Sequence, residues 1–431
     1  MDTIAKITLW GKEVGVVSWN AEKEYAVFEF IDSFIKEDID IAPLWMPMED
    51  LLRGERIFSF PALQGKTFKG LPGLIADSLP DDYGNTVIDE WFSSIGLSVP
   101  INPIDRLCYI GRRGMGALEY EPTRGNASLN ESSLIEIAAL TKLADNVLNQ
   151  RIEFQEDLRK NRDTLIDILK VGTSAGGAKP KAIIAFNEAT REVRSGQVQA
   201  PAGFSYWLLK FDGVEGGKIK DNPIGIGRIE YAYHKMAVDC GINMTECRLW
   251  HEGDKAHFMT KRFDRMDTGE KLHTQTLCGI AHFDRDKRYS YEQLFQVMRR
   301  LYLPYPDMEE IYRRMVFNVV ARNHDDHTKN HSFMMTEDGK WSLAPAYDLC
   351  YAYSPSGKWT NQHQLSLNGK RDNITRNDLL AVGKKMSINN CENIIDQVVD
   401  VLADWEVYAK EADVKKEYAE QIKDALRLLR K

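Results

Sequence analysis

Apolar and polar residues alternate along the first 30 residues of the chain. The alternation runs through Ile4, Lys6, Thr8 and Trp10 and returns at residues 26–30. A period of two, with β-branched and aromatic side chains, is typical of strands that bury one face. The start of the chain therefore predicts a small antiparallel sheet.

Glycine and proline then interrupt the pattern over residues 61–122, so mostly loops and short helices are expected there. The polar stretch 124–128 is the best candidate for a domain boundary. Ser132 or Ser133 is expected to cap a helix. The apolar residues of this helix are Leu134, Ile137, Ala138, Leu143 and Val147. A second helical pattern runs to residue 169.

The middle of the chain mixes both patterns. Apolar runs predict three strands, at residues 182–186, 204–211 and 257–263. A glycine-rich turn, 172–177, precedes the first of them. The helical pattern from Ile229 to Cys240 ends at Gly241, and glycine is common directly after a helix. Beyond Tyr291 the patterns are mostly helical.

These elements predict an α+β protein with a small β-rich N-terminal domain over residues 1–125. A mixed lobe over 126–265 and a helical C-terminal lobe over 266–431 follow. The length suits roughly two to four domains or lobes, at about 100–200 residues per domain. Hydrophobic residues make up 43% of the chain and charged residues 28%, which excludes a largely disordered or fibrous protein.

The charge balance is acidic, with 56 Lys and Arg against 64 Asp and Glu and a net charge of −8. It argues against a protein that coats nucleic acid. No window approaches the roughly 18–20 apolar residues of a membrane span, and the first residues do not resemble a signal peptide. The six cysteines form no C-x-x-C pair. A reduced, cytoplasmic protein without a zinc ribbon is therefore expected.

The densest group of polar residues spans 322–331 and directly follows an apolar, helix-like run. A solvated loop after a helix is its plainest interpretation. A transition-metal site is a second one, because histidine and aspartate side chains suit zinc, iron or manganese. The ligands of such a site would be His324, Asp325, His327 and His331.

The third interpretation is a phosphoryl-transfer loop. Asp325 and Asn330 have the D-x-x-x-x-N spacing of the catalytic loop of protein kinases, where the Asp orients the substrate hydroxyl and the Asn binds Mg²⁺. Further along, Asp348 is a candidate for the second metal position, or else a plain turn residue. Oxygen ligands from one Asp and one Asn suit Mg²⁺, with phosphate oxygens completing the shell.

Residues 172–181 offer a phosphate cradle, because small residues let backbone N–H groups approach a phosphate closely. Gly172 and Gly177 have the spacing of a Walker A loop. However, Ala178-Lys179-Pro180 replaces the required G-K-[ST], which excludes a P-loop NTPase. A flexible turn between helix and strand is the alternative.

Lys210 lies in an otherwise apolar strand, where a lysine is costly unless it is paired. The phosphate-contacting lysine of kinases has this setting. Glu230 on the next helix is a candidate ion-pair partner. The alternative is a lysine at a strand end whose ammonium group reaches out to water.

With these residues identified, the sequence resembles the HipA-type toxin kinases, the Ser/Thr kinase half of bacterial toxin–antitoxin pairs. The resemblance spans nearly the whole chain and rests on short motifs in the same order. They lie at residues 70–72, 76–80, 114–118, 174–181, the Lys210 strand, 262–265, 323–330 and 345–349.

The resemblance implies a bilobal kinase-like core with a helical C-terminal lobe, and ATP and Mg²⁺ as cofactors. Asp325 would be the general base or substrate-orienting residue, and Asn330 and Asp348 would hold Mg²⁺. Lys210 would contact the ATP phosphates, the 176–181 loop would cover them, and the 261–263 backbone would meet adenine. The full nucleotide-binding set would be Ala175, Gly176, Gly177, Ala178, Lys179, Pro180, Lys181, Lys210, Lys261, Arg262, Phe263, His327, Lys329, Asn330, Tyr347 and Asp348.

In this family a serine of the glycine-rich loop is self-phosphorylated, and Ser174 matches that position. The phosphate would add about −1.5 to −2 charge where ATP phosphates must sit, which would silence the enzyme. Two departures stand out. Lys179 makes the loop more basic than in the founding members and is expected to stabilise the phosphate or the phosphoserine. The segment 273–278 lacks an acidic residue often found there, which leaves the protein substrate open.

The leading hypothesis is a Mg²⁺- and ATP-dependent Ser/Thr kinase toxin that arrests growth. By resemblance, its target would be an aminoacyl-tRNA synthetase, with glutamyl-tRNA synthetase as the first choice. Its partner would be a HipB-like helix-turn-helix antitoxin from a separate chain, which would mediate contact with operator DNA. A second hypothesis is a non-catalytic co-repressor bound to that antitoxin, and a third is a metal-dependent hydrolase that uses the histidine cluster.

Overall fold

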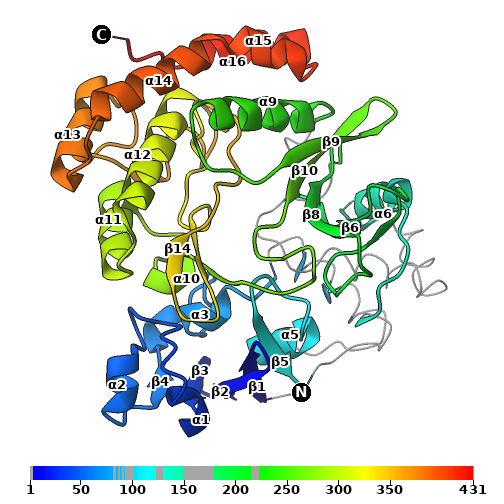
Figure 1. Cartoon of the computed structure of the whole chain (residues 1–431), viewed down its shortest axis with the longest axis vertical. Coiled ribbons are helices and arrows are strands. Elements are labelled where there is room, and N and C mark those ends of the chain that lie inside the picture. Colours follow the sequence, from blue (N-terminus) through cyan, green and yellow to red (C-terminus); the bar gives the residue numbers. More distant parts are fainter. Residues whose placement is uncertain are drawn as a thin grey trace.

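The computed structural model describes residues 3–80, 84–85, 88–89, 92, 101–122, 130–148, 179–214 and 223–430. This part of the chain is α+β, as predicted (Figure 1). Its strands are β1 (Ile4–Leu9), β2 (Lys12–Asn20), β3 (Tyr25–Phe30), β4 (Ile57–Ser59), β5 (Leu118–Glu121), β6 (Lys181–Phe186), β7 (Val193–Ser195), β8 (Ser205–Lys210), β9 (Cys247–Glu252), β10 (Lys255–Lys261), β11 (His273–Thr276), β12 (Tyr289–Ser290), β13 (Ser332–Met335), β14 (Trp341–Leu343) and β15 (Leu365–Ser366).

Helices are concentrated in the C-terminal half. They are α1 (Asp32–Ile35), α2 (Met48–Leu52), the 3₁₀ helix η1 (Pro61–Leu63), α3 (Gly73–Ala76), α5 (Pro103–Ile110), α6 (Ile137–Leu148), α9 (Ile226–Asp239), α10 (Leu277–Ala281), α11 (Tyr291–Arg300), α12 (Tyr305–Val320), α13 (Arg376–Met386), α14 (Cys391–Ala403), α15 (Trp405–Glu411) and α16 (Lys416–Ala425). Within the described ranges, none is both long and apolar enough to span a bilayer.

The N-terminal region, residues 3–122, is built on an antiparallel sheet with the order β4-β3-β2-β1-β5. The predicted sheet is thus confirmed. Strands β1 and β2 are joined by Trp10 and Gly11, which both have positive φ, at 51° and 76°. Such a two-residue turn matches the twist of the strands it connects. The alternating apolar side chains, including Ile7 and Phe28, form the core of this region.

A second sheet follows, with the order β7-β6-β8-β10-β9, and contains the three predicted strands. Helix α9 packs on it very closely, because a Cβ at Gly227 would lie 2.0 Å from the Ala256 carbonyl oxygen. The helix ends just before Gly241, whose φ of 80° suits the predicted stop. Lys210 on β8 and Glu230 on α9 therefore come from two tightly packed elements.

The predicted start of α6, the helix that precedes the second sheet in the chain, is wrong. Helix α6 begins at Ile137 rather than directly after Ser132 or Ser133. Leu134 instead forms a bridge with Arg194, beside strand β7, and is exposed. Sheet pairing thus overrides the capping signal. The predicted boundary 124–128, the second helix and the glycine-rich turn lie outside the described residues, and the three domain ranges stay a prediction.

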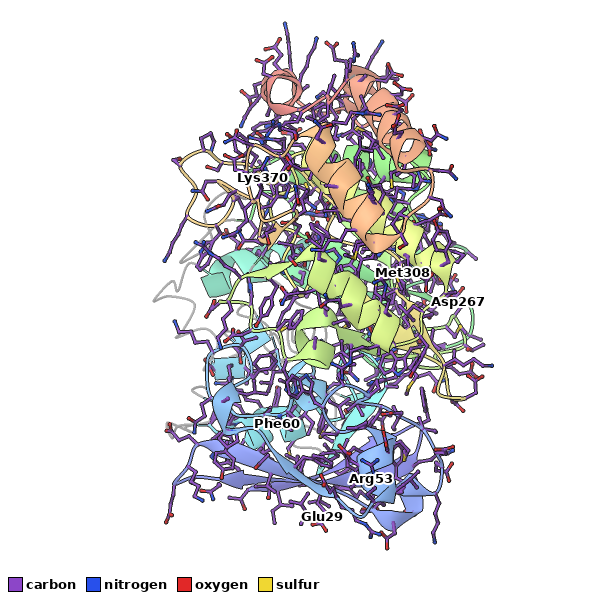
Figure 2. All side chains as sticks on the ribbon, turned by 90° about the vertical axis from the view of Figure 1, so that its left-hand side faces the viewer. Glu29, Arg53, Phe60, Asp267, Met308 and Lys370 are labelled. Carbon is purple, nitrogen blue, oxygen red and sulfur yellow. The ribbon has the colours of Figure 1, made fainter. Side chains whose placement is uncertain are left out.

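The C-terminal helices surround α12, whose buried residues include Tyr312 and Phe317. Figure 2 shows the N-terminal region, with Glu29, Arg53 and Phe60, at one end of the molecule. Lys370 lies toward the other end, with Met308 of α12 between. The small sheet β11-β13-β14 joins the helical region to the rest. The predicted mostly helical character beyond Tyr291 is confirmed.

A buried charge network ties the N-terminal region to the segment after β10. Asp264, only 1% exposed, accepts hydrogen bonds from Arg262, Arg265 and the backbone N–H of Gly116. Arg265 also donates to the carbonyl oxygens of Gly114 and Gly116. Burial alone would raise the pKa of Asp264, but the two guanidinium groups hold it well below its usual range.

Replacing Asp264 by alanine is expected to lower the free energy of unfolding by about 3–5 kcal/mol, because two buried guanidinium groups would lose their carboxylate. Urea unfolding measures this loss. Asp267→Ala is the matched control, since Asp267 makes an exposed ion pair with Lys261 that is worth at most about 1 kcal/mol. Equal losses in the two variants would contradict the structural role of Asp264.

Candidate active site

Lys210, at the end of β8, contacts two carboxylates at once. Its Nζ donates to Glu230 Oε1 on α9 and to Asp348 Oδ1, which follows the β13–β14 hairpin. The Lys210 side chain is 17% exposed. The ion pair with Glu230 that the sequence suggested is therefore present. The contact with Asp348 joins the second sheet to the C-terminal region.

Lys210 and Asp348 stabilise each other's charges, whereas burial raises the pKa of Glu230. Burial would lower the pKa of Lys210, but Asp348 and Glu230 raise it above its ordinary value. Burial likewise acts to raise the pKa of Asp348, yet Lys210 and Lys181 hold it below the usual range. Lys181 on β6 stands directly opposite Lys210 on β8. Two like charges in this register destabilise a sheet unless anions lie beside them.

The loop 323–331 connects α12 to β13 and carries two adjacent aspartates with opposite settings. The Asp325 carboxylate is 46% exposed and lies 3.7 Å from Nε2 of His327. The Asp326 carboxylate is buried and accepts hydrogen bonds from the Tyr291 hydroxyl at 2.8 Å and the Gln364 N–H at 2.7 Å. The Asp325 carboxylate is thus open to solvent, whereas the Asp326 carboxylate anchors the loop.

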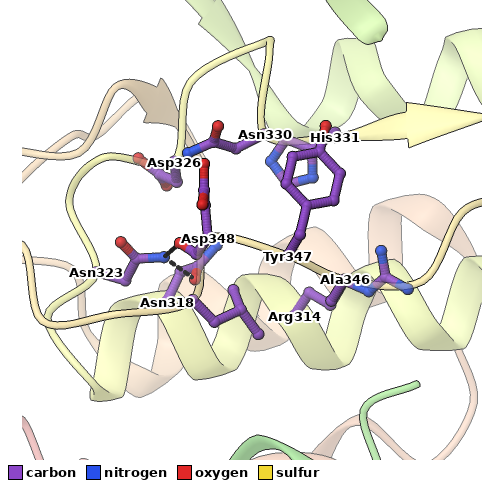
Figure 3. Close-up of a pocket in the computed structure, with 10 residues that line it drawn as sticks. Arg314, Asn318, Asn323, Asp326, Asn330, His331, Ala346, Tyr347 and Asp348 are labelled. Atoms are coloured by element: carbon purple, nitrogen blue, oxygen red, sulfur yellow. Dashed lines mark hydrogen bonds between the residues drawn. The ribbon is translucent and has the colours of Figure 1, made fainter. Parts of the chain in front are cut away.

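Asn330 and Asp348 line the same small pocket (Figure 3). The Asn330 Nδ2 donates to the carbonyl oxygen of Asp325 at 2.8 Å, which fixes the orientation of the amide. Asp348 has a left-handed backbone with a φ of 54°. One carboxylate and one amide oxygen form a hard-oxygen donor set of the kind that Mg²⁺ prefers. The residues present therefore fit a magnesium ion.

Tyr347 braces the 323–331 loop from the neighbouring segment. Its hydroxyl donates to the Lys329 carbonyl oxygen at 2.6 Å and contacts the hydroxyl of Ser332. Its ring stacks on Phe263 with centroids 5.8 Å apart. His327 accepts a hydrogen bond from the Lys329 N–H at Nδ1, and burial lowers the pKa of its imidazole. Near neutral pH His327 is therefore uncharged.

The segment 261–263 lies beside this site but is only partly open. The backbone N–H of Lys261 donates to Glu246 and that of Arg262 donates to Tyr206, both at 2.8 Å. The Arg262 side chain is buried against Asp264. Backbone pairing thus uses these two N–H groups. The contact of the 261–263 backbone with adenine stays a prediction.

The glycine-rich loop is only partly covered by the structure. Ser174, Ala175, Gly176, Gly177 and Ala178 lie outside the described residues. Lys179 is exposed, and its charge acts on Glu230. The Pro180 carbonyl oxygen accepts a hydrogen bond from the Phe211 N–H, and Lys181 starts β6. The described end of the loop thus leads directly to the Lys210 cluster.

The transition-metal interpretation finds no support in the histidines. The His324 ring packs against His363 and Tyr353, with centroids 4.1 and 5.0 Å away. His331 packs edge-on against Tyr291. Across the described ranges, no group of three or more His, Cys, Asp or Glu side chains is arranged to hold a metal ion. These histidines belong to the packing of the loop.

Family comparisons agree with this geometry. The HipA-like C-terminal domain matches residues 173–405, and the HipA N-terminal domain matches residues 5–121. The chain belongs to the HipA family. Among curated relatives, it is 26% identical over 142 residues to the serine/threonine-protein kinase toxin HipA of Shewanella oneidensis, and 26% identical over 153 residues to a candidate kinase of Haemophilus influenzae.

These alignments span 28% and 32% of this chain, and 33% and 44% of those two relatives. The comparison with solved structures covers much more of this chain. A chain of the Shewanella oneidensis complex of HipA, HipB and operator DNA matches with a TM-score of 0.66 at 17% identity. The match covers 97% of this chain and 96% of that one. The HipA fold thus extends over nearly the whole chain.

Proposed function

We propose that this HipA-family chain is a Mg²⁺- and ATP-dependent Ser/Thr protein kinase and the toxin of a toxin–antitoxin pair. The observation that carries the proposal is the position of Lys210 between Glu230 and Asp348, next to the pocket shared with Asn330. A strand lysine paired with a helix glutamate, beside an Asp and an Asn, is the residue set that phosphoryl transfer needs.

In this proposal Lys210 and Lys181 attract the phosphates of the nucleotide, and Asn330 and Asp348 hold the metal. Bound Mg²⁺ neutralises phosphate charge that these lysines leave uncompensated. Asp325 orients the acceptor hydroxyl and takes up its proton, and its exposed carboxylate is open to a protein substrate. Neutral His327 accepts a hydrogen bond at Nδ1, so its Nε2, which faces Asp325, carries the proton and can donate a hydrogen bond.

The rest of the nucleotide site is proposed from the family resemblance. Residues 175–181 cover the phosphates, with Lys179 adding positive charge. The backbone of Phe263 meets adenine, next to Tyr347. Lys329 lies beside the nucleotide. The matched complex contains HipB and operator DNA, which supports a HipB-like antitoxin as partner, with operator DNA reached mainly through it.

The substrate and setting are also proposals from the resemblance. We assign this chain a cytoplasmic role as a growth-arresting toxin that is connected with persistence. Its target would be an aminoacyl-tRNA synthetase, with glutamyl-tRNA synthetase tested first. Self-phosphorylation at Ser174 would switch the enzyme off, because the added charge repels the phosphates of ATP.

Purified protein incubated with Mg²⁺ and ATP is expected to gain the mass of one phosphate. Intact-mass measurement detects this gain, and Ser174→Ala is the matched variant that should show none while still transferring phosphate to a protein substrate. A wild-type protein that starts unphosphorylated and gains no mass would contradict self-inactivation. Failure to phosphorylate any protein as well would contradict the kinase assignment.

A further inference from the structure

Helix α3 of the N-terminal region lies directly against α10, the short helix after β11 (Figure 1). A Cβ at Gly73 would lie 2.0 Å from the carbonyl oxygen of Gly279. A Cβ at Gly279 would lie 2.1 Å from the carboxylate of Asp77. Any larger residue at these two positions would collide with the other helix or with Asp77. The two glycines therefore allow the close approach of α3 and α10.

Asp77, directly after α3, binds Thr276, the residue directly before α10. Its half-buried carboxylate accepts the Thr276 N–H at 2.7 Å and the Thr276 hydroxyl at 2.8 Å. The same hydroxyl accepts the N–H of Gly279 at 3.1 Å. The contact links residues 199 positions apart in the sequence. It fixes the whole turn from residue 276 to residue 279.

This turn also holds the 323–331 loop. The Leu277 N–H donates to the His331 carbonyl oxygen at 2.7 Å, and the Cys278 N–H donates to that of Thr328 at 3.0 Å. Cys278 is itself part of the apolar core of the N-terminal region. The two accepting carbonyls flank Asn330. The path from Asp77 to Asn330 therefore consists of hydrogen bonds between neighbouring residues.

We propose that Asp77 is a positioning residue for phosphoryl transfer, which acts through Thr276 on the part of the 323–331 loop that carries Asn330. The N-terminal region would then be part of the catalytic assembly, in addition to any role in partner binding. This inference rests on the proposed kinase function. A displacement of about 1 Å in a reacting group can lower a rate by about 10²-fold, so a loosened turn has a measurable cost.

Thr276→Val tests the inference, because valine keeps the shape of threonine and removes its hydroxyl. At saturating Mg²⁺ and ATP, we expect kcat for phosphate incorporation to fall, by up to about 10²-fold, while KM for ATP stays close to the wild-type value. Thr276→Ser keeps the hydroxyl and is expected to retain the wild-type rate. Asp77→Asn is expected to match Thr276→Val, and the double variant to be no slower than either single one.

Trp341→Phe is the matched control. Trp341 Nε1 donates to the Asp40 carbonyl oxygen at 3.0 Å, so this variant also removes one hydrogen bond to the N-terminal region, but away from the 276–279 turn. Its kcat is expected to stay at the wild-type value. Thermal unfolding of all variants separates a loss of rate from a loss of folded protein.

Hydrogen exchange provides a readout that needs no catalysis. The amides of Leu277 and Cys278 are expected to exchange faster in Thr276→Val than in the wild type and in Trp341→Phe. The inference is overturned if an active wild type and Thr276→Val share the same kcat, or if Trp341→Phe loses as much. If the wild type transfers no phosphate, the kinase proposal is overturned instead. If, in addition, the amides of Leu277 and Cys278 exchange equally fast in Thr276→Val and in the wild type, the link from Asp77 to the turn is overturned as well.

Discussion

Asp325→Ala is expected to slow phosphoryl transfer by about 10²–10⁴-fold, the usual contribution of a general base. The Asp325 carboxylate is 46% exposed and lies 3.7 Å from Nε2 of His327, so its removal breaks no fully buried ion pair. The protein should therefore stay folded. Initial rates with Mg²⁺ and ATP, beside thermal unfolding, measure both effects.

Asp326 provides the control for this variant, because it is the adjacent residue with the same side chain. Its buried carboxylate binds Tyr291, His363 and Gln364. Asp326→Ala is expected to lower the free energy of unfolding by about 3–5 kcal/mol. A wild-type rate in Asp325→Ala, or an unfolded Asp325→Ala beside a stable Asp326→Ala, would contradict the assignment of the two aspartates.

The acid dependence of stability tests the buried role of Asp326. Burial would raise the pKa of Asp326, but His363 and the other hydrogen-bond donors lower it to about 2. Its unfolded value is about 3.9. A carboxylate whose pKa is lower in the folded state than in the unfolded state stabilises the fold above the unfolded-state pKa. This contribution is lost as the pH falls toward the folded-state pKa. The wild type should lose stability between about pH 4 and pH 2, and Asp326→Asn should lose less over that range.

The phenotype on expression separates two functions that the sequence left open. If catalysis is responsible for growth arrest, cells that express Asp325→Ala should grow normally. If the chain acts mainly as a co-repressor with an antitoxin, Asp325→Ala should be as toxic as the wild type, because the exposed carboxylate is not part of the described core. Asp325→Ala must be present at the wild-type level for this comparison to hold.

Sequence reasoning worked where the deciding signal is local. Alternation over residues 4–30 identified the first sheet, and Gly241 marked the end of α9. A charged residue inside an apolar strand identified Lys210, and Glu230 followed from its place on the next helix. In each case the residues that decide the structure lie close together in the sequence or share one simple pattern.

Sequence reasoning failed where the local structure depends on a residue far away in the sequence. Helix α6 starts late because Leu134 pairs with Arg194, which lies 60 positions further along the chain. The network of Arg262 and Asp264 with Gly116, which lies 148 positions before Asp264 in the chain, was not predicted. The contact of Asp77 with Thr276 was not predicted either, although Asp77 lies in the 76–80 motif and Thr276 in the 273–278 segment. The available signal was an acidic residue, Asp77, in a mostly apolar motif. Its partner could be identified only once the fold was known.

Lys210→Met is expected to have a double effect, because the lysine neutralises two carboxylates and also binds phosphate in the proposed site. Loss of the cation removes the ion-pair partner that buried Glu230 and Asp348 share. The expected loss of stability is about 3–5 kcal/mol. Phosphoryl transfer should fall by about 10²–10³-fold, as when one donor to a developing charge is removed.

A second substitution separates these two effects. In Lys210→Met/Glu230→Gln the uncompensated buried carboxylate is gone, so much of the lost stability should return, since neutral groups are far cheaper to bury than charges. Phosphoryl transfer should stay as low as in Lys210→Met, because the ammonium group of Lys210 is still missing from the proposed phosphate site. Urea unfolding and initial rates on the same preparations measure the two quantities.

Lys235→Met is the matched control on the same helix as Glu230. Lys235 pairs with Glu411 at the surface, so its loss should cost at most about 1 kcal/mol and leave the rate unchanged. Recovery of activity together with stability in Lys210→Met/Glu230→Gln would show that Lys210 only balances charge within the protein. Recovery of stability alone would mean that the positive charge of Lys210 serves the transferred phosphate in addition to balancing the carboxylates.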